Sequence, residues 1–217
     1  IINATYVMLM TKFIFVTDAE FRREVFLCPH LFMKFSQHVM NKFSVLFLFQ
    51  GGHTKEMLTL LSCIGSQYTP RYYIIANTDH MSEDKVQQFE LKRKKDQQEK
   101  YMIYHVPRSR EVKQSWLTTM WTTMVATIYA FPVVFYLCPH IILCNGPGTC
   151  IPLCIAGIIH KVLTFGQTKI IYVESICRVE TLSLSGKILY YLADHMLVQW
   201  QSLQTKYPRT KYIGRIV

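Results

Sequence analysis

Apolar runs of strand length recur along the chain and predict six buried strands. The run at 43–49 is of buried-strand type and ends at a glycine turn, and the later runs have the same character. The predicted strands span 43–49, 71–76, 101–106, 140–144, 169–173 and 195–199. Runs without alternating polar positions are typical of strands that are covered on both faces of a sheet.

Between these runs the apolar residues change to helical spacing. In the segment 54–64 they fall on one helical face, at Met57, Leu60, Leu61 and Ile64. The predicted helices span 54–64, 86–100, 115–131, 149–163 and 183–193. The segment 86–100 carries charges of both signs in near balance, so we interpret it as a solvated helix or a loop and not as a nucleic-acid patch.

The helix predicted at 115–131 lies in a long stretch without any Asp, Glu, Lys or Arg, from Gln114 to His160. A membrane-spanning helix needs about 20 apolar residues in succession. Several threonines and the prolines Pro132 and Pro139 interrupt this stretch, which favours a buried helix, a turn and a buried strand over a span. We interpret 115–131 as core on one side and as a membrane-facing surface on the other.

The alternation of buried strands and helices predicts one α/β domain with a mostly parallel sheet covered on both faces. The length of 217 residues suits a single domain of this class with extra sequence. Such sheets bind ligands at the carboxyl ends of their strands. We therefore expect the functional residues in the turns that follow the strands. Three of these turns contain residue types suited to ligand binding or catalysis.

The first turn is Gly51-Gly52-His53-Thr54, between the first strand and its helix. Glycines let a backbone approach a phosphate closely, and a helix start offers unpaired N–H groups to an anion. His53 is placed to act as a general base on a sugar hydroxyl or to donate to a phosphate. Glu56, in the first turn of the helix, would compete with a bound anion.

The second and third turns follow the strands at 140–144 and 169–173. The second has the composition of an anion-binding turn at a helix start, through Asn145, Gly146, Gly148 and Thr149. In the third, Arg178 could clamp a diphosphate, and Glu174 could hold a sugar hydroxyl or orient a base. A local ion pair between Glu174 and Arg178 explains the same two residues equally well.

The composition combines an apolar chain with a strong positive charge. Hydrophobic residues make up 50% of the chain and the formal net charge is +10, which excludes a disordered protein and suits an anionic membrane surface or nucleic acid. The seven cysteines are odd in number and contain no CxxC pair, so a disulfide framework and a structural zinc site are both disfavoured. Reduced thiols in a cytosolic setting are expected.

Five motifs in one order resemble a known family. They are GGHT at 51–54, PRSREV at 107–112, LCNGPGTC at 143–150, YVESICRVETLS at 172–183 and GRIV at 214–217. This set is similar to the family of asparagine-linked glycosylation protein fourteen, the anchoring subunit of the dolichol-pathway UDP-N-acetylglucosamine transferase. The resemblance covers 43–217.

The resemblance implies a fold and a function. The fold is a single Rossmann-like domain that forms the N-terminal half of a GT-B glycosyltransferase. The function is to add the second N-acetylglucosamine to dolichyl-diphosphate-N-acetylglucosamine, on the cytosolic face of the endoplasmic reticulum membrane, in N-glycan precursor synthesis. The chain would face the lipid acceptor and recruit the catalytic subunit, protein thirteen of the same series, which binds most of the UDP-N-acetylglucosamine. Alone it would be inactive, and it would need no cofactor or metal.

On this basis the three turns are assigned to the acceptor. His53 and Glu174 are the candidate catalytic residues. The candidate diphosphate ligands are Gly51, Gly52, Thr54, Asn145, Gly146, Gly148, Thr149 and Arg178. The basic C-terminal segment is the expected partner-binding tail, with Tyr212, Ile213, Gly214, Arg215, Ile216 and Val217.

Two parts of the interpretation stay open. Residues 1–42 form a separate N-terminal segment, either a membrane anchor or the product of a wrong gene start. The alternative functions are a stand-alone Rossmann-type oxidoreductase, although GxGxxG is absent, and a purely structural membrane scaffold. We assign the positive charge to anionic lipid and a diphosphate acceptor and not to nucleic acid.

Overall fold

The computed structural model describes residues 44–49, 51–65, 68–93, 100–107, 116–146, 148, 150–163 and 168–216. The chain divides into two units, Ile1–Lys42 and Phe43–Val217. Every helix and strand below belongs to the second unit, and the first lies outside the described residues.

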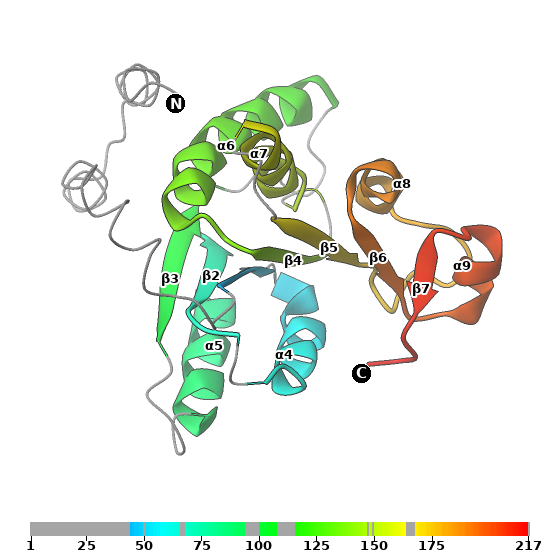
Figure 1. Cartoon of the computed structure of the whole chain (residues 1–217), viewed down its shortest axis with the longest axis horizontal. Coiled ribbons are helices and arrows are strands. Elements are labelled where there is room, and N and C mark those ends of the chain that lie inside the picture. The colour runs from blue at the N-terminus through cyan, green and yellow to red at the C-terminus, as the bar shows by residue number, and fades with distance from the viewer. Residues whose placement is uncertain are drawn as a thin grey trace. The chain divides into compact units, whose positions relative to one another are not determined.

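The second unit is built on a parallel sheet of seven strands in the order β3-β2-β1-β4-β5-β6-β7 (Figure 1). Every neighbouring pair of these strands runs parallel. The strands are β1 (Val45–Phe49), β2 (Arg71–Ala76), β3 (Tyr101–Val106), β4 (Ile141–Asn145), β5 (Lys169–Val173), β6 (His195–Val198) and β7 (Thr210–Tyr212). The predicted parallel α/β fold is confirmed.

Helices cover both faces of this sheet (Figure 1). The helices α4 (Thr54–Ser62) and α5 (His80–Arg93) lie on one face. The opposite face is covered by α6 (Trp116–Leu137), α7 (Cys150–Leu163) and α8 (Leu184–Leu192), and α9 (Gln201–Lys206) precedes β7. Because both faces are covered, side chains on both sides of β1 and β2 are buried, and Phe47 stacks on Tyr73 with ring centroids 5.5 Å apart.

The charged segment predicted to start at 86 is an ordered helix that begins earlier, at His80. Its inner face carries Ser82, Val86 and Glu90, which are buried four residues apart. Glu90 forms a buried two-point ion pair with Arg71 of β2, with Nε–Oε1 and Nη2–Oε2 distances of 2.8 and 2.7 Å. The segment is therefore a helix, as one of the two interpretations has it. It is not solvated on every side, because the buried Glu90 fixes it to the sheet.

Helix α6 is longer than predicted. It continues through Pro132 to Leu137, although a proline removes one helical hydrogen bond. The turn beyond the proline is held by packing, because Val133, Val134 and Leu137 are buried. Across the described residues, no helix is both long and apolar enough to cross a membrane.

The strand order places a ligand-binding position between β1 and β4. These two strands are neighbours, but the chain leaves β1 for α4 on one face and leaves β4 for α7 on the other (Figure 1). In open α/β sheets the crevice at this switch point is where ligands bind. The fold thus brings together the first two turns singled out in the sequence.

Candidate functional site

The turn after β1 begins a helix and leaves its backbone open. Gly51–His53 form a short 3₁₀ turn that runs directly into α4. The first N–H groups of a helix have no partner inside it, and α4 begins at Thr54, directly after this turn. Gly52 is exposed, and a Cβ built on it would meet no atom within 4 Å. The chain therefore has room at Gly52 for a ligand to approach its backbone.

His53 packs directly on the turn after β4. Gly146 has a φ of +109°, and a Cβ placed there would lie 2.8 Å from Cδ2 of His53. The carbonyl oxygen of Gly146 accepts a 2.9 Å hydrogen bond from the hydroxyl of Tyr172 on β5. Only glycine fits this position without strain, because it needs a left-handed backbone and lies against the imidazole.

Glu56 joins four strand ends in one buried cluster. Its Oε2 accepts hydrogen bonds of 3.0 Å from Nδ2 of Asn145 and from Nε2 of Gln199. Its Oε1 accepts a 3.3 Å hydrogen bond from the hydroxyl of Ser175, and lies 3.6 Å from Nδ1 of His53. These partners come from the ends of β4, β6, β5 and β1, and together with Glu56 we call them the Glu56 cluster.

The Glu56 cluster holds its carboxylate in the charged form. Burial alone raises the pKa of Glu56, but the interactions with His53, Asn145 and Gln199 outweigh burial and bring the pKa below its ordinary value. The carboxylate is buried and turned toward Asn145, Gln199 and Ser175, whose hydrogen bonds stabilise its charge. The expectation that Glu56 competes with a bound anion stays a prediction.

Two buried polar atoms beside Glu56 lack hydrogen-bond partners within the described residues. They are Nδ1 of His53 and Oδ1 of Asn145. The Asn145 oxygen is left over because the charged Glu56 takes the amide nitrogen. The 3.6 Å separation between Nδ1 of His53 and Oε1 of Glu56 is an ion-pair distance. No hydrogen bond within the described residues engages Nε2 of His53.

Glu174, the second candidate catalytic residue, is built into the loop after β5. It is only 1% exposed. Its Oε2 accepts from the backbone N–H and the hydroxyl of Ser183, at 3.0 and 3.1 Å, and its Oε1 accepts from the N–H of Ser175 at 3.2 Å. Burial raises the pKa of Glu174, and these hydrogen bonds offset only part of the rise. Glu174 thus fixes Ser183, the N-cap of α8, and stabilises the start of that helix.

Arg178 lies in the same loop and faces solvent. No ion pair joins it to Glu174 within the part of the chain that the structure describes, but its positive charge acts to lower the pKa of Glu174. Its backbone N–H donates to the carbonyl of Ser175 at 3.0 Å, which closes the loop. The side chain itself is exposed.

The remaining predicted ligands are placed differently from one another. Thr54 is buried, and its hydroxyl lies 2.6 Å from that of Ser82, so its side chain faces α5. Asn145 is buried in the Glu56 cluster, whereas Gly148 is half-buried at the start of α7. Thr149 lies outside the described residues. His53 and Gly146 are thus the predicted residues in contact at the switch point, and Gly51 and Gly52 lie in the turn that leads into His53.

The predicted partner-binding tail begins at Tyr212, the last residue of β7, and returns to the strand ends. Tyr212 and Ile213 are exposed, and Gly214 has a φ of +81°. The guanidinium of Arg215 lies over the Trp200 ring, 4.2 Å from its centroid. The N–H of Ile216 donates to Oε1 of Gln199 at 3.1 Å, and Val217 lies outside the described residues.

The sequence interpretation did not find Gln199, and it assigned Ser175 no role. Gln199 is the last polar residue of an apolar run, which is the one local indication that it lies at a strand end. Its partners are far away in sequence, so spacing could not reveal them. The described residues contain no group of three or more His, Cys, Asp or Glu side chains that could hold a metal.

Comparison with solved structures defines the class. The chain is similar to MurG of Acinetobacter baumannii with a TM-score of 0.52 and 14% identity, over 73% of this chain and 42% of MurG. At this identity the likeness shows the fold alone. The seven-stranded parallel α/β unit thus shares its fold with part of MurG.

Comparison of sequences then defines the family. The family model described as "Oligosaccharide biosynthesis protein Alg14 like" matches residues 44–216. The human UDP-N-acetylglucosamine transferase subunit ALG14 is 49% identical over 171 residues, which cover 77% of this chain and 79% of the human protein. The subunit of the same name from Yarrowia lipolytica is 38% identical over 216 residues, 99% of this chain and 96% of that protein. This chain belongs to the Alg14 family.

Proposed function

We propose that this chain is the acceptor-side subunit of the UDP-N-acetylglucosamine transferase that adds the second GlcNAc to dolichyl-diphosphate-GlcNAc. The observation that carries the proposal is the packing of His53, which directly follows Gly52, on Gly146 at the switch point of a half GT-B fold. The names of its relatives, UDP-N-acetylglucosamine transferase subunits, support the donor class. Family membership also favours transfer over the oxidoreductase alternative.

A single α/β half supplies one wall of the active-site cleft. A GT-B transferase reacts its two substrates between two such halves, and this unit contains one sheet with one row of strand ends. The catalytic subunit, asparagine-linked glycosylation protein thirteen, would supply the other wall and hold most of the UDP-GlcNAc. This chain alone is therefore expected to be inactive.

In the proposed reaction His53 is the general base. Its Nε2 takes the proton of the acceptor hydroxyl as the hydroxyl oxygen attacks the anomeric carbon of the donor sugar. The bond from that carbon to the β-phosphate oxygen breaks, and UDP leaves with the electron pair. Glu56, 3.6 Å from Nδ1, stabilises the imidazolium that forms. The backbone at Gly51 and Gly52, together with Arg178, would bind the acceptor diphosphate.

Reconstitution tests the proposal. Transfer of labelled GlcNAc from UDP-GlcNAc to a dolichyl-diphosphate-GlcNAc analogue is measured for this chain, for the partner and for the mixture. We expect turnover only from the mixture, and we expect His53→Ala to lower kcat by about 100-fold or more. His80→Ala, an exposed histidine on α5, is the matched control. Turnover by this chain alone would contradict the subunit assignment, and full turnover by His53→Ala would exclude the base.

The exposed tail is the proposed docking site for the catalytic subunit. Tyr212 and Ile213 present apolar surface beside the exposed Arg215. Aromatic and arginine side chains are enriched at the centres of protein interfaces. In co-purification from detergent-solubilised membranes, Tyr212→Ala/Ile213→Ala should lose the partner, whereas Met102→Ala on the opposite edge strand should retain it. Retention by the tail variant would remove the tail from the interface.

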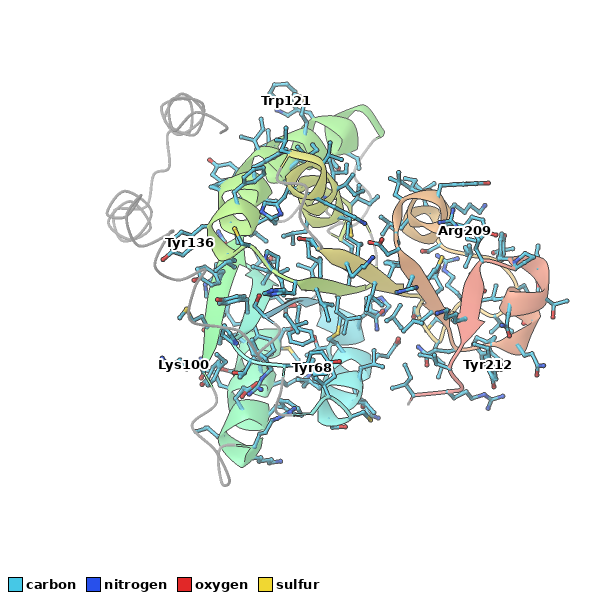
Figure 2. All side chains as sticks on the ribbon, in the orientation of Figure 1. Tyr68, Lys100, Trp121, Tyr136, Arg209 and Tyr212 are labelled. Carbon is cyan, nitrogen blue, oxygen red and sulfur yellow. The ribbon has the colours of Figure 1, made fainter. Side chains whose placement is uncertain are left out.

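We further propose that α6 lies against the cytosolic face of the endoplasmic reticulum membrane. The helix contains no charged residue, and Trp121, Met124 and Ile128 are exposed along it. Trp121 is 64% exposed, and Figure 2 shows it at the outer side of α6, away from the sheet. Tryptophan and large aliphatic residues insert readily at the membrane interface.

The membrane assignment is tested with the full chain in complex with its partner. Trp121→Glu/Ile128→Glu should lower transfer to an acceptor embedded in phosphatidylcholine–phosphatidylserine vesicles by about tenfold. Transfer to a short-chain, water-soluble acceptor should be unchanged. Leu91→Glu, an exposed leucine on α5 at the other face of the sheet, is the control. Equal transfer to the embedded acceptor by both variants would show that α6 does not touch the membrane.

A further inference from the structure

Gln199 connects the C-terminal tail to the Glu56 cluster. It follows β6 directly and is 1% exposed. Its Nε2 donates to Oε2 of Glu56 at 3.0 Å and to the carbonyl of Glu174 at 3.2 Å. Its Oε1 accepts the N–H of Ile216 at 3.1 Å. Both ends of one buried carboxamide are therefore engaged, one by the site and the other by the tail.

The tail is held against the strand ends by contacts around Gln199. The N–H of Ile213 donates to the carbonyl of Val198 at 3.0 Å, and Arg215 stacks on Trp200. Trp200 is itself fixed, because its Nε1 donates to the carbonyl of Ile176 at 2.7 Å. These contacts flank Gln199 on both sides in the sequence, so the position of the tail and that of the carboxamide are set together.

The two ends of a carboxamide cannot be exchanged at this position. If it were flipped, Oε1 would face the charged Glu56 and the amide nitrogen would face the N–H of Ile216, so both contacts would be repulsive. Glu56, the carbonyl of Glu174 and the N–H of Ile216 therefore all select the same orientation of the carboxamide. When the tail leaves, Oε1 of Gln199 loses its donor, and the carboxamide is held at its nitrogen end only.

We propose that Gln199 is a positioning residue that couples the seating of the C-terminal tail to the placement of Glu56 beside His53. The proposal deepens the proposed function, because it makes the acceptor-side base depend on the segment on which the catalytic subunit would dock. A subunit that holds the tail in place would then also order the site. An unseated tail leaves Gln199 held at its nitrogen end only, so the donor that it offers to Glu56 is less firmly placed.

Two pairs of variants in the full chain separate coupling from simple packing. Gln199→Met keeps the size of the side chain and removes its hydrogen bonds, and Gln87→Met makes the same change at an exposed position on α5. Ile216→Pro removes the N–H that Gln199 accepts, whereas Ile216→Ala trims the side chain and keeps the N–H. Each variant is made with isotope-labelled histidine and asparagine side chains.

The first measurement uses this chain alone and does not depend on catalysis. In NMR spectra, Gln199→Met and Ile216→Pro should shift the His53 ring signals and the Asn145 carboxamide signals away from their parent positions. Ile216→Ala and Gln87→Met should leave both sets of signals in place. If Ile216→Pro leaves them unmoved, or if Ile216→Ala moves them as far, the tail is not coupled to the site through its N–H.

The second measurement uses the complex with the catalytic subunit. Gln199→Met should lower kcat about tenfold with little change in the KM for UDP-GlcNAc, since it acts on the acceptor-side base. Unchanged kcat with shifted NMR signals would show a coupling without catalytic consequence and would overturn the positioning role. A parent complex without turnover would instead reject the proposed function, and the NMR result would still decide the coupling.

Discussion

Gly146 lies directly against the imidazole of His53, so closely that a Cβ at Gly146 would come within 2.8 Å of Cδ2 of the ring. The two residues stand in turns that leave neighbouring strands on opposite faces of the sheet. Their contact therefore marks the switch point and fixes one side of the histidine. Glu56 approaches the same ring at Nδ1, so that the remaining nitrogen has a defined direction.

Substitution of Gly146 should affect both folding and transfer. Gly146→Ala forces a side chain into a φ of +109° and against His53, at a cost of about 2–4 kcal/mol in the free energy of unfolding. Chemical denaturation checks this value, and the complex should lose turnover by more than tenfold. Gly157→Ala, whose Cβ would crowd Ile142 on β4, serves as the destabilised control with His53 untouched. Equal turnover in the two variants would show that the His53 contact has no role in transfer.

Substitution of Gly52 should affect ligand binding without destabilising the fold. Gly52→Ala meets no atom within 4 Å and lies in a helical turn, so it should raise the free energy of unfolding by up to about 1 kcal/mol. If a diphosphate approaches this backbone, the methyl group blocks it, and the acceptor KM of the complex should rise about tenfold. Steady-state kinetics at varied acceptor concentration measure the effect. An unaltered KM would place the diphosphate elsewhere.

The Glu56 cluster should make stability depend on pH at the acid side. Because the pKa of Glu56 is lowered in the folded protein, the unfolded chain binds its proton more readily. The stabilisation is therefore complete above the unfolded value of about 4.3, and it is lost as the pH falls through the lowered folded value. Glu56→Gln should remove this part of the pH dependence and cost about 2 kcal/mol at pH 7. Urea unfolding between pH 3 and pH 7 measures the free energy of unfolding of both proteins. Parallel curves of this free energy against pH would show that Glu56 contributes no such linkage.

Glu174 can be tested for a catalytic role against a neighbour that only disturbs its position. A Cβ at Gly186 would lie 2.2 Å from Oε2 of Glu174, so Gly186→Ala should push the carboxylate off Ser183. If Glu174 only holds the loop in place, Glu174→Gln should lose stability and kcat in the same proportion as Gly186→Ala. Thermal melts and turnover of the complex give both quantities. A loss of kcat far beyond that of Gly186→Ala at equal stability would show that Glu174 takes part in the reaction.

Arg178 should matter for ligand binding and not for folding. Its side chain is exposed and forms no ion pair with any described residue, so Arg178→Ala should change the free energy of unfolding by less than about 0.5 kcal/mol. The KM for the acceptor should rise about tenfold if the guanidinium binds the diphosphate. Arg209→Ala, which loses an arginine over the Tyr190 ring (Arg209 is labelled in Figure 2), is the control. A change in KM that both variants share would reflect net charge alone.

The local features of this site could be predicted from the sequence. The glycine turn at Gly51 and Gly52 stands between an apolar run and a helical pattern, and both patterns are short-range. The parallel sheet and its two covered faces follow from the same alternation. The β7 strand was not predicted, because its three residues are too few for a periodic pattern.

The Glu56 cluster could not be predicted in this way. Glu56 meets Asn145 and Gln199 across 89 and 143 residues of sequence, and nothing in the spacing of a lone acid in a helical turn reveals such partners. The same holds for α6, whose extension past Pro132 depends on buried contacts that a local helix-breaking rule does not include.

The sequence by itself determined the order of strands, turns and helices, the parallel α/β class and the motifs of the Alg14 family, because each of these is written in residues close together in the chain. The tertiary structure decided which way the polar groups face. It turned Glu56 inward toward hydrogen-bond donors, built Glu174 into a loop, set Gly146 on His53 and linked the tail to the site through Gln199. Those outcomes depend on strand ends meeting at one edge of the sheet, and only the folded chain brings the strand ends together.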